Sequence, residues 1–360
     1  MKPGNFDRIK TPIGVMLIAV LALLSSSCAT IGYYRQSVTG HMSIWMGRQD
    51  IADMLSGENG RPITPAKRRW LLKVLKIRAF STEALHLPAN YSFKSYTNIR
   101  RKHVVWNVVA APEFSLKPKL FCFVMMGCLS YKGYFAEKNA QALAKKLKAQ
   151  GYDVYVGGVS AYSTLGWFAD PVLSNFTGWS EDVLAGLMFH ELAHQVVYIK
   201  GDTVFNESFA TAVEMEGIKR WTKHRSQPGL SKQYKDNKQR ERQFIALVLK
   251  FRKRLKLLYA TKQSDSIKRI KKQKIISAMR KAYIVLRKKW GGYKGYDRWM
   301  SSSLNNAKLA SVSTYHKYVP AFQKLLMKSG YDMKAFYREV ARIGEMPAAQ
   351  RHRVLDEMKN

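Results

Sequence analysis

Residues 190–194 combine side chains of the types and spacing that can bind a metal ion. They read His-Glu-Leu-Ala-His, which is the pattern H-E-x-x-H. In a helix, residues four apart lie on one face, so His190 and His194 can present two imidazoles to the same ion. Glu191 would then lie beside the open coordination position, where a carboxylate can accept a proton from water. Because so short a pattern can occur by chance, the flanking sequence is needed to decide whether it indicates a metal site.

The residues around this pattern are typical of a helix buried within a domain. Ser180 is a favourable N-cap, and two acidic residues follow it, where the helix dipole favours negative charge. Lys200 and Gly201 would provide a basic last turn and a C-cap. The apolar side chains at helical spacing between these ends are Val183, Leu184, Leu187, Met188, Leu192, Val196 and Val197. Burial of two histidines and a glutamate there would be costly without a partner such as a metal ion.

A third ligand follows within a short distance along the chain. A polar link at residues 201–203 leads to a second predicted helix that starts near Asn206. A short link makes the two helices antiparallel neighbours, so Glu207 can face the two histidines. Two histidines and one glutamate form the ligand set of many catalytic zinc sites. The alternative is that Glu207 is an ordinary glutamate favoured by the helix dipole. Glu214, two turns further on, is either a partner of a ligating histidine or a solvated residue.

The N-terminal segment is typical of export rather than of the folded domain. Residues 1–28 contain a basic start, an apolar run at residues 13–24 that is short for a membrane span, and small residues before Cys28. This arrangement resembles a bacterial lipoprotein signal, which predicts lipidation of Cys28 and a membrane-anchored protein that faces the periplasm or the exterior. Simple cleavage, or an uncleaved anchor, is the alternative.

Two cysteines remain after Cys28. Cys122 and Cys128 are close enough in sequence to close a small loop by a disulfide in an oxidising compartment. The alternative is a pair of buried free thiols. Metal binding by these two cysteines is not expected, because no second Cys or Cys/His pair accompanies them.

The rest of the chain, residues 29–360, is long enough for one large domain with a substantial core. Residues 40–87 are mostly helical in pattern, and residues 136–150 form a helix that Gly151 stops. The segments predicted as strands are residues 103–110, 120–126 and 153–159. No low-complexity linker and no internal repeat interrupts this order.

Positive charge is concentrated in one region of a chain whose formal net charge is +36. Residues 217–294 contain only three acidic residues among many lysines and arginines, with leucine and isoleucine at helical spacing. This pattern predicts long amphipathic helices with a basic outer face. On an exported protein it suggests an anionic partner, such as envelope lipids or cell-wall polymers. A nucleic-acid partner is disfavoured by the export signal, and a generally basic proteome is the simplest alternative.

Two motifs resemble those of a family of predicted bacterial zinc aminopeptidases, many of them lipoproteins. They are H-E-L-A-H-Q at residues 190–195 and F-N-E-S-F-A-T-A-V-E at residues 205–214. The resemblance covers nearly the whole chain after the signal segment. Other matching segments lie at residues 105–108, 111–113, 151–158, 162–168, 170–174 and 318–322.

This resemblance implies an α+β, mainly helical, zincin-like metallopeptidase fold with a small β-sheet beside the H-E-x-x-H helix. It implies Zn²⁺ held by His190, His194 and Glu207. It also implies that an edge strand between Tyr155 and Trp167 pairs with the substrate, although an aromatic core cluster would explain those residues as well. Tyr315, with His316 second, is the candidate donor to the oxyanion, and a core or surface aromatic is the alternative reading.

The chain departs in three ways from the wider group of H-E-x-x-H metallopeptidases with a glutamate ligand. Only twelve residues separate His194 from Glu207, which is fewer than usual. Thr211 stands where an aspartate often helps to orient a histidine ligand. The chain has no G-x-M-E-N element, which binds the free amine of the substrate in one aminopeptidase group. The residues therefore predict the metal site more directly than they predict exopeptidase activity.

The sequence predicts a zinc-dependent peptide hydrolase of the bacterial envelope, with aminopeptidase as the favoured activity. Zinc would lower the pKa of its water, and Glu191 would accept the proton and pass it to the leaving amine. Two alternatives remain open. One is a non-catalytic envelope lipoprotein with a structural metal site that binds anionic envelope components. The other is a zinc amidase or endopeptidase that acts on cell-wall peptides.

Overall fold

The computed structural model describes residues 32–58, 60, 62–123, 127–161, 164, 168–225, 228–314 and 317–359. The chain forms two compact units, residues 1–47 and residues 48–360. In the first unit, residues 32–46 are helical. The predicted signal segment and Cys28 lie outside the described residues. Within the described part of the chain, no helix combines the length and apolar character that crossing a membrane requires.

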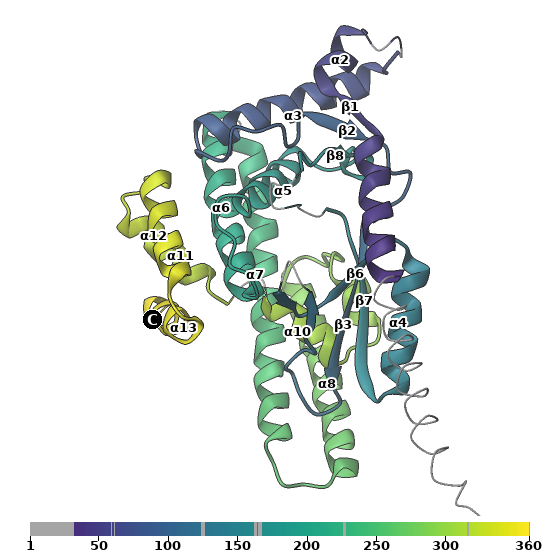
Figure 1. The fold of residues 1–360 in the computed structure, drawn as a ribbon. Coiled ribbons are helices and arrows are strands. Elements are labelled where there is room, and N and C mark those ends of the chain that lie inside the picture. Colours follow the sequence, from purple (N-terminus) through teal and green to yellow (C-terminus); the bar gives the residue numbers. More distant parts are fainter. Residues whose placement is uncertain are drawn as a thin grey trace, which may run out of the picture. The chain divides into compact units, whose positions relative to one another are not determined.

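The second unit is mostly helical, with short strands in the first half (Figure 1). Its strands are β1 Arg48–Asp50, β2 Ser95–Thr97, β3 Val105–Pro112, β4 Phe121–Phe123, β5 Gly127–Leu129, β6 Lys132–Tyr134, β7 Tyr152–Val159 and β8 Val172–Leu173. Its helices are α2 Ile51–Ser56, α3 Pro65–Glu83, α4 Glu137–Ala149, α5 Glu181–Ala193, α6 Thr203–His224, α7 Pro228–Tyr259, α8 Asp265–Lys289, α9 Asp297–Ser301, α10 Asn306–Thr314, α11 Val319–Lys328, α12 Met333–Glu345 and α13 Ala348–Lys359. The predicted α+β, mainly helical class is therefore confirmed.

The strands form three small sheets rather than one. One sheet has the order β1-β2-β8, the second has the order β6-β3-β7, and β4 pairs with β5. The longest pairing is antiparallel, between β3 and β7, and runs from Val105 opposite Val159 to Pro112 opposite Tyr152. The predictions of β3, β7 and α4 are confirmed to within two residues at each end.

The predicted strand at residues 120–126 is only partly present. Strand β4 ends at Phe123, residues 124–126 are not described, and β5 returns antiparallel to β4. Cys122 pairs with Cys128 across this hairpin, and the two form a disulfide. A reversal of the chain direction, rather than a longer strand, therefore brings the two cysteines together.

Helices α5 and α6 lie side by side because glycines let their backbones approach closely. A Cβ atom on Gly186 of α5 would lie 2.8 Å from the Ile218 side chain of α6. A Cβ atom on Gly217 of α6 would lie 2.6 Å from the Phe189 ring of α5. Helix α3 covers the pair, where Phe80 contacts the Phe189 ring at a centroid distance of 6.0 Å. This three-helix arrangement is the scaffold of the candidate site (Figure 1).

Helices α7 and α8 form a long hairpin, drawn in green at the bottom of Figure 1. The side chains that pack between them belong to one buried apolar cluster: Phe244, Val248, Phe251, Leu255, Ile276, Met279 and Tyr283. Lys272 ties the hairpin to the central sheet, because its ammonium lies 2.7 Å from Asp153 of β7. The prediction of long amphipathic helices in this region is confirmed.

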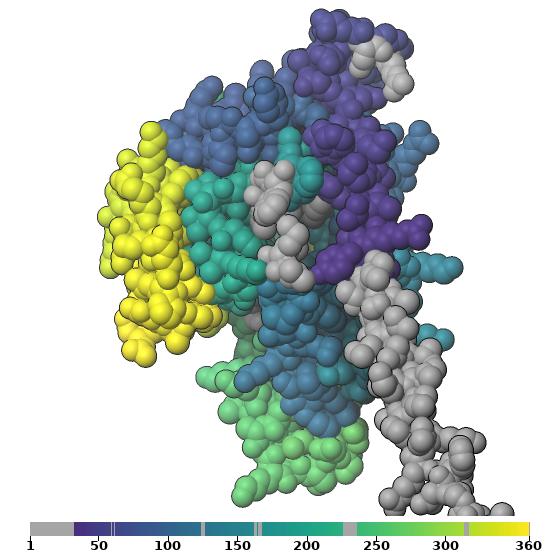
Figure 2. Space-filling view, in the orientation of Figure 1, coloured from purple at the N-terminus to yellow at the C-terminus, as the bar shows by residue number. Residues whose placement is uncertain are grey.

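The three C-terminal helices contact α6 or its N-cap, α11 and α12 through aromatic residues and α13 through Arg351. Phe322 of α11 contacts Phe205 and Phe209 of α6 edge-on, at centroid distances of 5.2 and 5.9 Å. Arg351 of α13 donates from two guanidinium nitrogens to Asp202, the N-cap of α6, at 2.8 and 2.9 Å. In Figure 2 these helices are the yellow region that lies against the teal surface of the metal-site helices. They therefore fix the start of α6, where Glu207 lies.

Candidate metal centre

Helix α5 presents His190 and His194 on one face, but it is shorter than predicted. Its N-cap is Ser180, as expected, and it ends at Ala193 with His194 as the C-cap, whereas the sequence predicted an end near Lys200. After Ala193 the backbone hydrogen bonds shorten to three-residue spacing, from the Gln195 N–H to the Leu192 carbonyl at 3.1 Å and from the Val196 N–H to the Ala193 carbonyl at 2.9 Å, and the α-helix ends. Further along, the Asn206 side chain bonds both the N–H and the C=O of Ile199, at 2.8 Å each, and holds the link in its non-helical course.

The start of α6 places Glu207 opposite the two histidines. The carboxylate of Asp202 accepts a hydrogen bond from the Phe205 N–H at 3.1 Å, and the helix therefore begins at Thr203, three residues before the predicted start. Asn206 is buried against the link between the helices, and the next side chain, Glu207, points toward α5. The short link and the Asp202 cap together determine which sides of α5 and α6 face each other.

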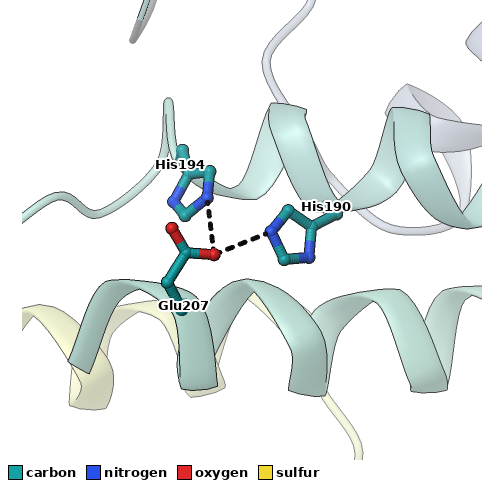
Figure 3. A group of neighbouring side chains, drawn as sticks. All are labelled: His190, His194 and Glu207. Carbon is teal, nitrogen blue, oxygen red and sulfur yellow. Dashed lines mark hydrogen bonds and ion pairs between the residues drawn. The ribbon is translucent and has the colours of Figure 1, made fainter. Parts of the chain in front are cut away.

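The structure brings His190, His194 and Glu207 together as one group, and Figure 3 shows all three converging from two helices. The Oε2 atom of Glu207 lies 3.3 Å from Nε2 of His190 and 3.8 Å from Nε2 of His194. One ligand atom from each residue lies within 4.8 Å of the other two. All three side chains are largely buried.

The donor set fits a zinc ion. Zinc–nitrogen and zinc–oxygen bonds of about 2.0–2.2 Å in a tetrahedral site place neighbouring ligand atoms roughly 3.4 Å apart. The two separations between Glu207 and the histidines, 3.3 and 3.8 Å, are close to this value. Two imidazoles and one carboxylate leave the fourth position open, as catalytic sites require.

Glu214 lies on the other side of His190 from Glu207. Its Oε2 atom is 3.4 Å from Nδ1 of His190, and its Oε1 atom accepts from the Lys238 ammonium at 2.9 Å. The second interpretation of Glu214, as a solvated residue, is therefore wrong. Lys238 comes from α7, and no local pattern marks it as a partner of Glu214. It also contacts Glu241, at 2.9 Å.

These contacts fix the charges around His190. Burial by itself would lower the pKa of His190, but its hydrogen bonds to the carboxylates of Glu207 and Glu214 outweigh that effect and raise the pKa to about 10. Burial opposes ionisation of Glu214, yet its contacts with His190 and Lys238 lower its pKa to about 2. Without a metal ion, His190 is therefore a cation held between two carboxylates.

His194 and Glu191 are governed mainly by burial. Burial lowers the pKa of His194 to about 4, which leaves a neutral imidazole suited to metal binding. Burial raises the pKa of Glu191 to about 7, and the charges of Glu207 and Asp170 act in the same direction. A carboxyl group poised near neutral pH is suited to accept a proton and release it again.

The loop at residues 88–92 holds the end of α5 in place. The Gln195 side chain, next to His194, accepts from Asn90 at 2.7 Å and donates to Ser92 at 3.2 Å. The buried guanidinium of Arg78 in α3 donates to the Ser92 carbonyl at 2.8 Å and to the Asn90 carbonyl at 2.9 Å. This loop, which no sequence pattern predicted, therefore fixes the position of His194.

Several other predicted site residues are not among those that the structure describes. Tyr315, His316 and Trp167 lie outside the described residues, as does Cys28. Thr211 is buried in α6 and replaces the aspartate that often orients a histidine. In the part of the chain that the structure describes, the Nδ1 atom of His194 has no hydrogen-bond partner. Of the two histidines, only His190 is therefore oriented by a carboxylate.

One comparison with known proteins gives a match. The model of the protein family described as "Putative aminopeptidase" matches residues 32–355, which is most of the chain. A search of curated proteins and a search of solved structures each returned no match.

Proposed function

The chain belongs to the putative aminopeptidase family, and from this premise we propose that it is a zinc-dependent peptide hydrolase with a zincin-like catalytic centre. Aminopeptidase is the specific activity that we favour. The observation that carries the proposal is the convergence of His190, His194 and Glu207 from two packed helices, with Glu191 beside them.

Each residue of the site has a distinct role in this proposal. His190, His194 and Glu207 would hold Zn²⁺, whose chemistry here is Lewis-acid activation of water and of the peptide carbonyl. Glu191 accepts a proton from the attacking water and returns it to the leaving amine, which its pKa of about 7 favours. Glu214 keeps the proton of His190 on Nδ1, so that Nε2 remains available to the metal.

Hydrolysis by the zinc-loaded protein tests this proposal. Peptides with a free amino terminus, amino-terminally blocked peptides and cell-wall peptides separate exopeptidase, endopeptidase and wall-amidase activity. Glu191→Gln should retain zinc and lose at least about 100-fold in kcat/KM, because general-base catalysis typically contributes about 10²–10⁴-fold. Glu216→Gln is the matched control, since Glu216 pairs with Arg220 and not with the site. Full activity of Glu191→Gln would remove Glu191 from the mechanism.

We also propose that the protein is anchored in the bacterial envelope by lipidation of Cys28. The segment before Cys28 supports this, because its basic start, short apolar run and small residues are those of a lipoprotein signal. Mass spectrometry of the protein purified from membranes would detect the added lipid. A soluble product without any modification of Cys28 would contradict the anchor.

The α7–α8 hairpin supports a further proposal, an anionic partner in the envelope. Sixteen residues between 250 and 289 are lysine or arginine, and Asp265 alone is acidic. Arg269, Lys272 and Arg287 are paired with carboxylates, and the other thirteen have no ion-pair partner among the described residues. Exposed aliphatic side chains lie between these cations: Leu257, Ile267, Ile270, Ile284 and Val285. This mixture favours the surface of an anionic phospholipid bilayer over a purely polar polymer.

A further inference from the structure

A cavity of about 350 Å³ lies between strands β3 and β7 and helices α7 and α10. Its volume is in the range of about 300–1,000 Å³ that is typical of small-molecule and substrate sites. Its walls are rich in aromatic rings, contributed by Tyr131, Tyr155, Phe244, Tyr296 and Trp299. In Figure 1 it falls in the region where α10 lies beside α7 and β3.

The aromatic walls are held in place by their own contacts. Phe244 of α7 stacks on Tyr296 at a centroid distance of 4.1 Å and meets Trp299 edge-on at 5.1 Å. The buried ammonium of Lys308 lies 4.7 Å from the Trp299 ring and 5.4 Å from the Tyr155 ring. Because these rings are fixed on one another, the cavity is preformed and can select a ligand by shape.

On the helical side, a chain of ion pairs runs from the cavity wall to Nδ1 of His190, on the side of the imidazole away from Glu207. Glu241 lines the cavity and contacts Lys238 at 2.9 Å. Lys238 contacts Glu214 at 2.9 Å, and Glu214 contacts His190 at 3.4 Å. Three successive contacts therefore separate the cavity wall from a predicted zinc ligand.

The sheet side gives a second, independent connection. Val159, the last residue of β7, lines the cavity. Ala161, two residues further along the chain, lines a small second cavity together with Glu191. Two residues of extended chain span only about 7 Å. The aromatic cavity and the small cavity that Glu191 lines thus adjoin nearby positions of the same segment.

The chemistry of the lining restricts what the cavity can accept. Among the described residues that line it, Glu241 is the single one with a formal charge. Apolar and aromatic groups gain most from burial against such walls. A carboxylate ligand would lose its hydration against these walls, and no cation among the described lining residues would offset that loss, since Glu241 is already paired with Lys238.

We propose that this cavity is the subsite that receives a large apolar or aromatic side chain of the substrate, next to the peptide bond that is cleaved. The inference rests on the proposed function, since it assigns the substrate class of that same centre. The subsite accepts phenylalanine and leucine, accepts glycine poorly and excludes aspartate.

Peptide binding to the zinc-loaded Glu191→Gln full-length protein tests the assignment without hydrolysis. The probes are tetrapeptides that begin with Phe, Leu, Gly or Asp, each with a free and an acetylated amino terminus, measured by calorimetry. The Phe and Leu peptides should bind at least about 10-fold more tightly than the Gly peptide, with Asp weakest. The free and acetylated series show whether the terminal amine contributes to binding. Equal affinities for Phe, Gly and Asp peptides would overturn the proposal.

Two substitutions in the same protein probe the cavity wall directly. Ser311→Phe inserts a ring from α10 into the cavity, so the preference for Phe over Gly should fall about 10-fold while the affinity for the Gly peptide changes less than about 2-fold. Ser277→Phe, at an exposed position on α8, is the matched control and should leave the preference unchanged. Glu241→Gln should improve binding of the Asp peptide alone. An unchanged preference in Ser311→Phe would also overturn the proposal.

The outcome distinguishes this inference from the proposed function. Hydrolysis of all peptides by the wild-type protein without side-chain preference would contradict the subsite and leave the hydrolase intact. Selective binding of Phe and Leu peptides without any hydrolysis by the zinc-loaded wild-type protein would contradict the hydrolase and leave the selective cavity intact.

Discussion

His190 is the residue on which the candidate site depends most, because it is held from both sides. Its Nε2 atom lies 3.3 Å from Glu207, and its Nδ1 atom lies 3.4 Å from Glu214. Glu214 in turn is bonded to Lys238. A histidine that is oriented in this way loses little conformational entropy when it binds a metal ion, and Glu214 favours retention of the proton on Nδ1 when Nε2 binds the metal.

Removal of the Glu214 carboxylate, which contacts His190 and is not itself a ligand, should weaken metal binding. Glu214→Gln takes the negative charge away from Nδ1 of His190, and such changes typically cost about 10–100-fold in metal affinity. Glu216→Gln, two residues along the same helix, is the control. Competition with a chelator at pH 7 measures both affinities. Equal zinc affinity of the two variants would contradict the role of Glu214.

Zinc binding should release a proton from His190. The pKa of His190 is raised to about 10 in the metal-free protein, so its imidazole is protonated at pH 7, whereas a zinc ligand must be neutral. Zinc affinity should therefore fall as the pH is lowered and rise as the pH approaches 10. Calorimetry in buffers with different ionisation enthalpies counts the released protons, and Glu214→Gln, which lowers this pKa, should reduce the count. A binding enthalpy that is the same in every buffer would contradict this.

The metal ligands could be predicted from the sequence, but some of the residues that surround them could not. His190, His194 and Glu207 could be predicted because the four-residue spacing and the short link to the next helix are local. Lys238 could not be predicted, because it reaches Glu214 only through the packing of α7, 24 residues further along the chain. The role of Arg78, which holds the loop beside Gln195, likewise depends on tertiary contacts.

At the scale of elements, the link between α5 and α6 controls the site. Asn206 bonds to both backbone groups of Ile199, and Asp202 caps α6. The link is thus fixed by side chains where the sequence predicted a continuing helix. The end of α5 was therefore predicted six to seven residues too late, because the apolar spacing of Val196 and Val197 does not reveal side-chain competition for the backbone.

Asn206→Ala should destabilise the protein and weaken its metal site together. The change leaves the N–H of Ile199 without its partner and removes one of the two hydrogen bonds to its C=O, which costs about 1–3 kcal/mol of unfolding free energy. Asn98→Ala, in an exposed turn, is the control and should change stability by less than about 0.5 kcal/mol. Denaturant unfolding of the metal-free proteins gives both values. A change no larger than that of Asn98→Ala would contradict the role of the link.

The elements themselves were unequally predictable. The α7–α8 hairpin and α4 have long periodic patterns, and the β3 and β7 strands are rich in valine, so local sequence was sufficient. The strands β1, β2 and β8 have only two or three residues each and were not predicted. Their pairing depends on partners up to about 80 residues away in the sequence.

At the scale of the whole molecule, the net charge of +36 was visible in the composition, and the structure shows where much of it lies. Thirteen cations between residues 250 and 289 have no ion pair with any carboxylate in the described ranges, and they are spread along α7, α8 and the turn between them. Such a cluster of positive charges attracts anionic surfaces, and salt weakens this attraction.

The hairpin should bind anionic vesicles in a salt-dependent manner. Protein without its signal segment, and so without a lipid anchor, should bind phosphatidylglycerol vesicles and not phosphatidylcholine vesicles in a flotation assay. A triple variant in which Lys271, Lys274 and Lys281 are changed to Glu should bind these vesicles at least about 10-fold more weakly, because each cation contributes about 1 kcal/mol near such a surface. The same change at Lys145, Lys146 and Lys148 of α4 is the control. Equal losses in both variants would show a general charge effect and contradict a role for the hairpin.

The zinc content of the purified protein tests the central claim most directly. After incubation with zinc and removal of the excess, elemental analysis should find about one zinc per chain in the wild-type protein, and far less in Glu207→Ala, because that change removes one of three ligands. Glu191→Gln should keep its zinc, since Glu191 is not a ligand. A wild-type protein that binds no zinc, or a Glu207→Ala variant that binds as much as the wild type, would contradict the metal centre described here.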